Sequence, residues 1–427
     1  MEDIIVIGAG PSGLMAAIQA SYLGASVTVL EHNDRPLKKL YATGNGRCNF
    51  SNLYMDDKVY RGRDPEFAYG IIDDFDRNDL LLFFHNLGMT TRHIGDYLYP
   101  RNEQARTVAD VLLLECRRLN VRIICGENAV NITRENGFCV TTDREVYHCS
   151  SLILAPGGMA SPSHGSDGSL NGIIKKLGIG FVEQKRALVP LLHDDKEFKK
   201  LAGVRIKCMV SLLADGQKES SERGEIMINK DNISGIPIMQ LSRYATQALD
   251  EGRKVYIIID LFPDESEDEL NRLVYNAFRG YRYACAVMQD VQDKDREGYD
   301  RTGAEALSLI LNEKLAMYCL NRTGISSGAP SVKVPDKKIG ELTGLMKGLR
   351  IRATGDAGWD RAQVTAGGVD TAELSEGMEV RKIPGLYVVG ELADIDGTCG
   401  GYNLQWAFSS GAAAGRSAGA KIRGKRG

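Results

Sequence analysis

The sequence predicts an α/β fold with an inserted antiparallel β domain and a helical segment nested inside that insertion. Three observations support this prediction. Residues 3–31 follow the order strand, glycine turn, helix, strand, acidic residue. Short alternating apolar stretches begin near residue 187, and a charged helical stretch over residues 265–320 interrupts them. With 427 residues, the chain is long enough for two or three domains.

Residues 3–31 match the dinucleotide-binding βαβ unit. Apolar residues 3–7 form the first predicted strand, residues 14–23 the helix, and residues 27–30 the second strand, which ends at Glu31. The turn residues predicted to hold the dinucleotide are Gly8, Gly10, Pro11, Ser12 and Gly13. These glycines permit a tight turn, a close approach of the backbone to a pyrophosphate, and close packing of the helix on the strand. The helix N-terminus would face the phosphates, and Glu31 would accept hydrogen bonds from ribose hydroxyls.

The composition argues against several classes of function. A net charge of −3 gives no electrostatic basis for binding nucleic acid. The acidic start is unlike a signal peptide, and no apolar run approaches the ~18 residues of a membrane helix. The nine cysteines form no CxxC pair and no zinc-ligand spacing with histidine. We therefore expect a cytoplasmic protein with reduced thiols, no bound metal, and no nucleic-acid or membrane partner.

Residues 36–52 are too polar and glycine-rich for a core element and predict a long loop directly after the βαβ unit. Long ordered loops in such positions are usually functional, and a plain surface loop is the alternative. The predicted cofactor contacts of this loop are Gly46, Arg47, Cys48 and Asn49. Further on, the extended segment 97–102 carries two tyrosines and an arginine, and either borders a substrate pocket or packs.

The next part of the chain adds helices and strands to the same domain. Helices are predicted over 79–87 and 107–119, and strands over 121–124, 129–132, 138–141 and 152–155. The last strand ends in Gly157 and Gly158, and small residues at the end of a buried parallel strand suit the close approach of a dinucleotide. Ala129 and Val130 complete the cofactor contacts expected in this region.

The C-terminal part indicates which dinucleotide is bound, because the first βαβ unit alone does not separate FAD from NAD. Residues 384–391 form a buried strand that ends in glycine and a carboxylate, and a helix follows from about residue 403 to 417. In glutathione-reductase-like proteins such an acidic residue binds the ribityl chain of FAD. The helix N-terminus would stabilise negative charge on reduced flavin. The predicted contacts here are Gly390, Glu391, Gly401, Tyr402, Asn403 and Leu404.

Three stretches, residues 43–52, 364–369 and 396–411, resemble signatures of the BaiN-like (YhiN/HI0933-like) flavoprotein family, also called aminoacetone oxidase-like. The resemblance covers essentially the whole chain. It implies a glutathione-reductase-like FAD-binding Rossmann domain, an inserted antiparallel β-barrel domain and a nested small helical domain. Asn45 departs from the family pattern of small residues, but asparagine tolerates left-handed backbone.

The expected domain boundaries follow these changes of pattern. Residues 1–186 and 364–427 form the FAD-binding domain, residues 187–261 and 341–363 the β-barrel, and residues 262–340 the helical domain.

The predicted activity is that of an FAD-dependent oxidoreductase, with two-electron hydride transfer at flavin N5. Arg47 and Asn49 are candidate donors near the isoalloxazine and Tyr402 is a candidate proton donor, each against a purely structural role. No second GxGxxG motif precedes a helix, so no separate NAD(P)H domain is visible.

Three functions remain open at this point. The preferred one is NADH- or NADPH-driven reduction of a small organic acceptor such as an enone, for which the resemblance admits bile-acid-type steroids. An oxygen-using amine oxidase of the aminoacetone type is the first alternative. An RNA-modifying or structural flavoprotein is the second. The substrate and the oligomeric state are not predicted.

Overall fold

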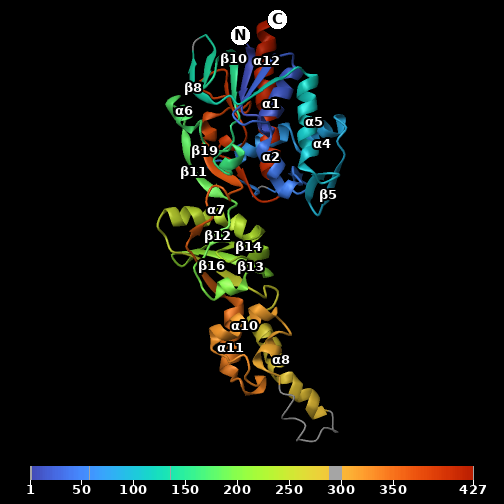
Figure 1. The fold of residues 1–427 in the computed structure, drawn as a ribbon, viewed down its shortest axis with the longest axis vertical. Helices are drawn as coiled ribbons and strands as arrows, with labels where there is room; N and C mark the ends of the chain where they lie inside the picture. The colour runs from blue at the N-terminus through green and yellow to red at the C-terminus, as the bar shows by residue number, and fades with distance from the viewer. Residues whose placement is uncertain (1, 57, 135, 288–300, 427) are drawn as a thin grey trace. The chain divides into compact units, whose positions relative to one another are not determined.

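A computed structural model describes residues 2–56, 58–134, 136–287 and 301–426. The chain divides into two compact units (Figure 1). The first comprises Met1–Leu188 and Gly358–Gly427, and the second comprises Val189–Ala357. Each unit has a hydrophobic core of its own.

The first unit is built on a seven-stranded sheet in the order β7-β2-β1-β10-β9-β8, with β20 paired to β10. Its strands are β1 Glu2–Ile7, β2 Val27–Glu31, β7 Arg122–Cys125, β8 Ala129–Arg134, β9 Phe138–Thr142, β10 Val146–Leu154 and β20 Leu386–Val388. The β7, β2, β1, β10 and β20 strands are parallel, whereas β8 and β9 are antiparallel additions. Residues 4–7 of β1 are all buried, as expected for a parallel strand covered on both faces. The Rossmann-like α/β fold predicted from the sequence is confirmed.

Two helices from opposite ends of the chain pack side by side against this sheet (Figure 1). They are α1 Pro11–Tyr22 and α12 Tyr402–Arg426. A Cβ atom added at Gly411 would lie 2.4 Å from the Ser12 carbonyl oxygen, and one at Gly415 would lie 2.3 Å from the Ala16 carbonyl oxygen. These glycines, four residues apart on one face of α12, let the two helix backbones approach closely.

The segment after the βαβ unit is more ordered than the loop predicted from its polarity. It contains α2 Lys38–Ala42, a 3₁₀ turn over Thr43–Gly46 and β3 Ser51–Asn52. Leu40, Cys48 and Phe50 are fully buried, and the Phe50 ring packs 5.4 Å from that of Phe84. The prediction of a loop without core residues was therefore wrong, because three apolar side chains anchor the segment to the core.

The remaining elements of the first unit surround the same region. The three-stranded sheet β3-β6-β5 contains β5 Thr91–Ile94 and β6 Tyr97–Pro100. Two further pairs are β4 Tyr60–Arg61 with β21 Asp396–Gly397, and β11 Phe181–Ala187 with β19 Val364–Val369. The helices are α3 Glu66–Asp74, α4 Arg77–Asn86, α5 Ala105–Arg118 and α6 Asn171–Lys176.

The second unit holds an antiparallel seven-stranded sheet in the order β17-β16-β13-β14-β15-β12-β18. Its strands are β12 Leu191–Leu192, β13 Arg205–Ala214, β14 Gln217–Ile228, β15 Asn232–Ser234, β16 Val255–Asp260, β17 Leu349–Ala353 and β18 Gly355–Asp356. Only Thr354 separates β17 from β18, so one bent stretch joins the two edges of the sheet. The sheet is therefore strongly curled, and the closed barrel stays a prediction together with the domain boundaries.

Helices complete the second unit. They are α7 Ile236–Asp250, α8 Glu267–Val287, α9 Gly303–Leu307, α10 Glu313–Thr323 and α11 Asp336–Lys347. The sequence predicted the helical texture of residues 265–320 but not α7, which follows β15 directly.

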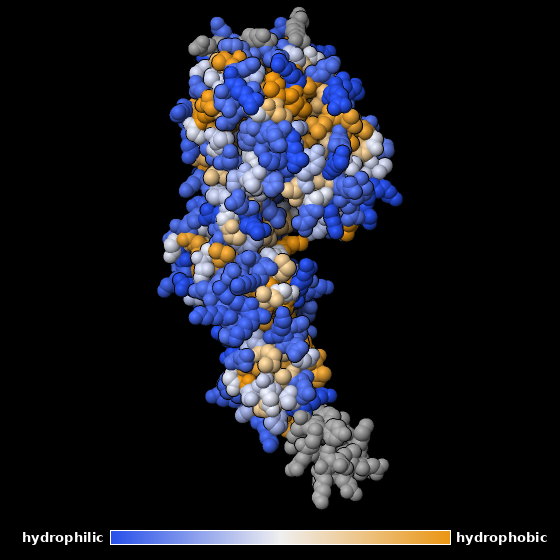
Figure 2. Space-filling view, viewed as in Figure 1, coloured by the Kyte–Doolittle hydropathy of each residue, from blue (hydrophilic) through white to orange (hydrophobic). Residues whose placement is uncertain are grey.

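The face of the protein in Figure 2 is mostly hydrophilic, with apolar residues in small separate areas. Among the described residues, no helix combines the length and apolar character needed to cross a membrane.

Candidate active site

The turn between β1 and α1 leaves the N-terminus of α1 open. Gly10 is the N-cap residue in extended conformation (φ −78°), and no side chain caps the helix. A Cβ atom added at Gly10 would meet no atom within 4 Å, so open space lies beside this backbone. At Gly13, in contrast, a Cβ would lie 2.0 Å from the Gly8 carbonyl oxygen. The first turn of α1 therefore packs tightly on the strand while its N–H groups border free space, as a pyrophosphate requires.

Glu31 lies at the tip of β2, and its carboxylate is buried and held in place. Its Oε2 accepts a hydrogen bond from the Ala9 N–H at 2.7 Å. Its Oε1 accepts from the backbone N–H and the side-chain amide of Asn33, at 2.9 and 2.7 Å. A carboxylate has about four acceptor positions, so one remains for a ribose hydroxyl.

The segment before β8 lies beside this acid. The Glu127 N–H donates to the Glu31 carbonyl at 2.9 Å, and the Gly126 N–H donates to the Asn33 carbonyl at 3.0 Å. Ala129 is buried at the start of β8, whereas Val130 is 50% exposed. Ala129 and Val130 thus lie two and three residues after Glu127, which is hydrogen-bonded to the tip of β2.

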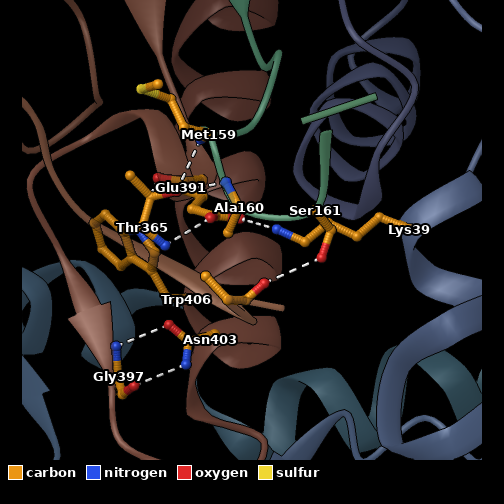
Figure 3. A network of polar contacts seen from close by, with 11 residues as sticks. Lys39, Met159, Ala160, Ser161, Thr365, Glu391, Gly397, Asn403 and Trp406 are labelled. Atoms are coloured by element: carbon orange, nitrogen blue, oxygen red, sulfur yellow. Dashed lines mark hydrogen bonds and ion pairs between the residues drawn. The ribbon is translucent and has the colours of Figure 1, made fainter. Parts of the chain in front are cut away.

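A polar network joins four segments around Glu391 (Figure 3). The Lys39 Nζ forms an ion pair with Glu391 Oε2 at 2.7 Å, and the Thr365 N–H donates to Glu391 Oε1 at 2.9 Å. The Thr365 hydroxyl oxygen in turn accepts from the N–H groups of Met159 and Ala160 at 2.8 and 3.0 Å. Glu391 is therefore fixed by a cation and by a backbone donor, with part of its carboxylate still exposed.

Gly158 belongs to this network through its lack of a side chain. A Cβ there would lie 2.3 Å from the Thr365 hydroxyl oxygen and 3.0 Å from Glu391 Oε1. Gly157 has a left-handed backbone (φ +83°), and the nearby Ser166 hydroxyl is buried with no hydrogen-bond partner among the described residues. A residue larger than glycine at position 158 would thus collide with Thr365. Ser166 places a polar atom beside Gly157.

The loop ending at Asn49 meets the N-terminus of α12. A Cβ at Gly401 would lie 2.5 Å from the Ser51 carbonyl oxygen and 2.7 Å from Asn49 Oδ1. Asn49 Oδ1 is itself buried, and no residue in the part of the chain that the structure describes donates a hydrogen bond to it. Asn45 takes a left-handed backbone (φ 55°), as expected for this substitution in the loop. A buried amide oxygen without a donor leaves a free acceptor at the junction of loop and helix.

The surroundings of two other residues of this loop, Arg47 and Cys48, argue against a reactive role for them. Arg47 is 58% exposed, and its NH1 lies 3.7 Å from Glu103 Oε2. Burial raises the pKa of the Cys48 thiol to about 12, so this thiol stays protonated at neutral pH. Gly46, between Asn45 and Arg47, adopts a left-handed backbone that turns the chain (φ 85°).

The start of α12 is held by its own polar contacts. The Tyr402 hydroxyl donates to the Tyr54 carbonyl at 2.9 Å, and burial raises the pKa of Tyr402 to about 12. The Asn403 amide both accepts from and donates to the backbone of Gly397 at 2.8 Å (Figure 3). One turn further on, the Trp406 indole N–H donates to the Gly390 carbonyl at 2.9 Å. Leu404 is half-buried in the same turn.

These residues fit an FAD molecule. The open helix N-terminus at Gly10 and the carboxylate of Glu31 suit its adenosine and phosphate part. The free polar atoms of Ser166 and Asn49 lie at the predicted flavin part. When bound there, FAD supplies two-electron hydride chemistry.

The family model of the HI0933-like protein Rossmann domain matches residues 2–417. A 3-dehydro-bile acid delta(4,6)-reductase of Clostridium scindens is 36% identical over 98% of this chain and 99% of its own. The chain belongs to the HI0933-like family. We therefore conclude that it is an FAD-dependent oxidoreductase with a Rossmann-like fold.

Two further comparisons found lower similarities. A ribosomal RNA dihydrouridine synthase of Escherichia coli is 27% identical over 96% of both chains. The solved 3-ketosteroid delta1-dehydrogenase of Sterolibacterium denitrificans has a TM-score of 0.48 at 12% identity, and covers 98% of this chain and 99% of its own.

The structure brings several of the predicted site residues of this family member into two groups. Around α1 lie residues 8–13 with Glu31, and around α12 lie Asn49, Gly401 and Tyr402. The guanidinium of Arg47 instead pairs with Glu103. The sequence prediction missed Lys39 and Thr365, because their partner Glu391 lies 352 and 26 residues away.

Tyr97 and Tyr99 also border the second group. They alternate with buried Leu98 and Pro100 on β6, so both tyrosines lie on the opposite, half-buried face of the strand. Burial raises the pKa of both tyrosines, and smaller contributions come from Cys399 at Tyr97 and from Cys48 at Tyr99. The alternation of tyrosine with Leu98 and Pro100 in the sequence is the signal that places both tyrosines on one face of a strand.

Proposed function

We propose that the protein reduces a carbon–carbon double bond conjugated to a carbonyl group, with NADH or NADPH as the electron donor. A steroid-type enone is the first candidate acceptor. The observation that carries this proposal is the similarity over nearly all of both chains to a 3-dehydro-bile acid delta(4,6)-reductase, at 36% identity.

Reduction of such a bond needs a proton donor as well as a hydride donor, and Tyr97 suits that role. Its phenol is half-buried, and burial together with Cys399, Tyr99 and Asp96 raises its pKa above the ordinary value of 10. The Tyr97 Oη–H therefore remains protonated at neutral pH. It forms no hydrogen bond with another residue in the part of the chain that the structure describes, so it is available to an acceptor.

Tyr402, the donor expected from the sequence, is less suited. Its hydroxyl already donates to the Tyr54 carbonyl, and its side chain is 5% exposed. We therefore assign Tyr402 a positioning role at the start of α12 and retain Asn49 as a polar contact of the cofactor. The variants Tyr97→Phe and Tyr402→Phe test this assignment.

The direct test is an anaerobic titration of the holoenzyme. NADH or NADPH should bleach the flavin absorbance. A 4-en-3-one steroid should then restore the absorbance and be recovered with its carbon–carbon double bond reduced. Bleaching by aminoacetone but by neither nicotinamide nucleotide would instead support the amine oxidase alternative.

Similarity to a ribosomal RNA dihydrouridine synthase favours a second candidate, the reduction of uridine in RNA. The net charge of −3 argues against it. Filter binding with a ribosomal RNA fragment at physiological salt distinguishes the two. Tight binding, followed by NAD(P)H-dependent formation of dihydrouridine, would favour the RNA substrate.

A further inference from the structure

A cluster of basic side chains lies beside the loop 44–49 and has no role in the chemistry described above. It lines a cavity formed by Thr91, Arg92, His93 and Arg101. The first three residues belong to β5, and Arg101 directly follows β6. The residues that line this cavity thus include two guanidinium groups and an imidazole but no carboxylate.

Only one carboxylate among the described ion pairs reaches these arginines. Arg92 NH1 lies 3.0 Å from Glu103 Oε1, and Arg47 NH1 lies 3.7 Å from the other oxygen of Glu103. Arg101 forms no ion pair with any residue in the described ranges. Arg92 and Arg47 therefore share the carboxylate of Glu103, and Arg101 adds a third guanidinium group beside them. This excess of positive charge attracts an anion.

Glu103 also connects the cavity to the predicted flavin part of the site. Through its two oxygens it bridges Arg92 in the cavity and Arg47 in the loop 44–49. On β6, Tyr99 lies opposite Arg92, and both side chains share the face that carries Tyr97. An anion bound by Arg92 would therefore lie on the same side of this small sheet as the proposed proton donor.

Exposed apolar side chains lie on the same small sheet and directly after its strand β3. Leu53, Tyr54 and Ile94 are 37%, 57% and 40% exposed. Ile94 pairs with Tyr97 across the β5–β6 ladder, and the Leu53 N–H donates to the carbonyl of Asp96 at 2.7 Å. Apolar surface next to a cationic cavity suits a ligand with an apolar body and one anionic group.

We propose that the cavity of Arg92 and Arg101 binds the carboxylate of the substrate, and that the substrate is an amphipathic organic acid. This inference rests on the proposed function, whose acceptor it narrows. The 2′-phosphate of NADPH carries similar oxyanion chemistry, and RNA carries phosphodiesters. The apolar residues 53, 54 and 94 favour an acid with an apolar body over NADPH or RNA. The test therefore includes NADPH and RNA as alternative ligands.

The test compares an acid with its uncharged ester on the FAD-loaded protein. 3-Oxochol-4-enoate and its methyl ester are titrated by calorimetry into the wild type and the double variant Arg92→Gln/Arg101→Gln. We expect the wild type to bind the acid about 10-fold more tightly than the ester, and the double variant to bind both alike. Arg106→Gln is the matched control, because Arg106 is a 77% exposed arginine paired only with Asp110 on α5.

Several results would overturn the inference. Equal affinities of acid and ester for the wild type would do so, as would an acid preference that survives in the double variant. A loss of NADPH affinity without a loss of NADH or acid affinity would assign the cavity to the 2′-phosphate. Binding of an RNA stem–loop that depends on the two arginines would assign it to nucleic acid. Unchanged FAD content and circular dichroism establish that the double variant is folded.

Turnover of the ester separates this inference from the proposed function. Reduction of the ester by the wild type, with equal affinities for acid and ester, would refute the carboxylate site alone. An arginine-dependent preference for the acid, with neither compound reduced in the presence of NADH or NADPH, would refute the proposed reaction and support the anion site.

Discussion

The two ends of the cofactor site are built in different ways. The adenine end, residues 8–13 with Glu31, is held by a contact between Ala9 and Glu31 that spans 22 residues. The flavin end, which comprises residues 44–52, 157–158 and 390–403, depends on contacts that span 348 to 354 residues, such as those from Lys39, Ser51 and Asn52. The adenine end is therefore a local structure, whereas the flavin end forms only when distant parts of the chain fold together.

This difference has consequences for function. A local motif can be disabled by one added methyl group without disturbing the fold. The flavin end shares its residues with the core, so its substitutions combine effects on stability and on chemistry. Substitutions at the two ends separate the effects on stability from those on chemistry.

The largest effect is expected at the flavin end, for Tyr97→Phe. Loss of a general acid should lower the turnover number for an enone by about 100-fold or more, with little change in FAD content. Because the pKa of Tyr97 is raised above 10, activity of the wild type should fall only above pH 10, where the phenol ionises. Stopped-flow measurement of flavin reoxidation from pH 6 to 11 checks both.

Tyr402→Phe is the comparison for this variant. It removes a hydrogen bond to the Tyr54 carbonyl and should cost about 1 kcal/mol of stability, with turnover nearly unchanged. A larger loss of turnover in Tyr402→Phe than in Tyr97→Phe would return the proton-donor role to Tyr402.

A large loss of stability is expected for Thr365→Val. The substitution keeps the shape of the side chain but removes the acceptor for the N–H groups of Met159 and Ala160. Two unsatisfied donors should lower the free energy of unfolding by about 2 to 4 kcal/mol. Thr365→Ser keeps the hydroxyl and should lose about 1 kcal/mol. Urea unfolding of both proteins measures the difference, and equal losses would show that the hydroxyl is not what holds the Gly158 loop.

At the adenine end, Gly10→Ala should weaken FAD binding by about 10- to 100-fold, because the new methyl group would occupy space needed by the pyrophosphate. A Cβ at this position meets no protein atom within 4 Å, so the stability of the apoprotein should not change. Gly172→Ala is the matched control, since a Cβ at Gly172 likewise meets nothing. Fluorescence titration of FAD into both apoproteins measures this, and equal affinities would place the phosphates elsewhere.

The smallest effect is expected for Arg47→Gln. Its exposed contact with Glu103 at 3.7 Å should contribute less than about 1 kcal/mol to stability. FAD affinity and turnover of an uncharged enone should stay within about twofold of the wild type, because an exposed ion pair contributes little. A tenfold loss of either would restore Arg47 as a direct donor to the flavin.

The same contrast explains what the sequence could predict. The strand, turn, helix and strand of the adenine end were predictable, because glycine spacing, a buried strand and a terminal acid all lie within 31 residues. The pairing of Lys39 with Glu391 has no local signal, although residues 36–52 and residues 384–391 each stand out by their own sequence pattern. In the second unit, α7 was missed although Ile238, Leu241, Ala245 and Ala248 recur at helical spacing. Short strands precede and follow α7, so the whole region was predicted as strands with alternating apolar residues.

A single turnover under argon is the most direct test of the proposed NAD(P)H-driven enone reduction. Holoenzyme reduced with one equivalent of NADH or NADPH is mixed with a 4-en-3-one steroid while flavin absorbance is followed and the product is analysed by mass spectrometry. We expect one equivalent of reduced flavin to be reoxidised for each steroid molecule that gains two hydrogen atoms. Flavin that stays reduced with the enone, but is reoxidised by oxygen after reduction by a small amine, would contradict it.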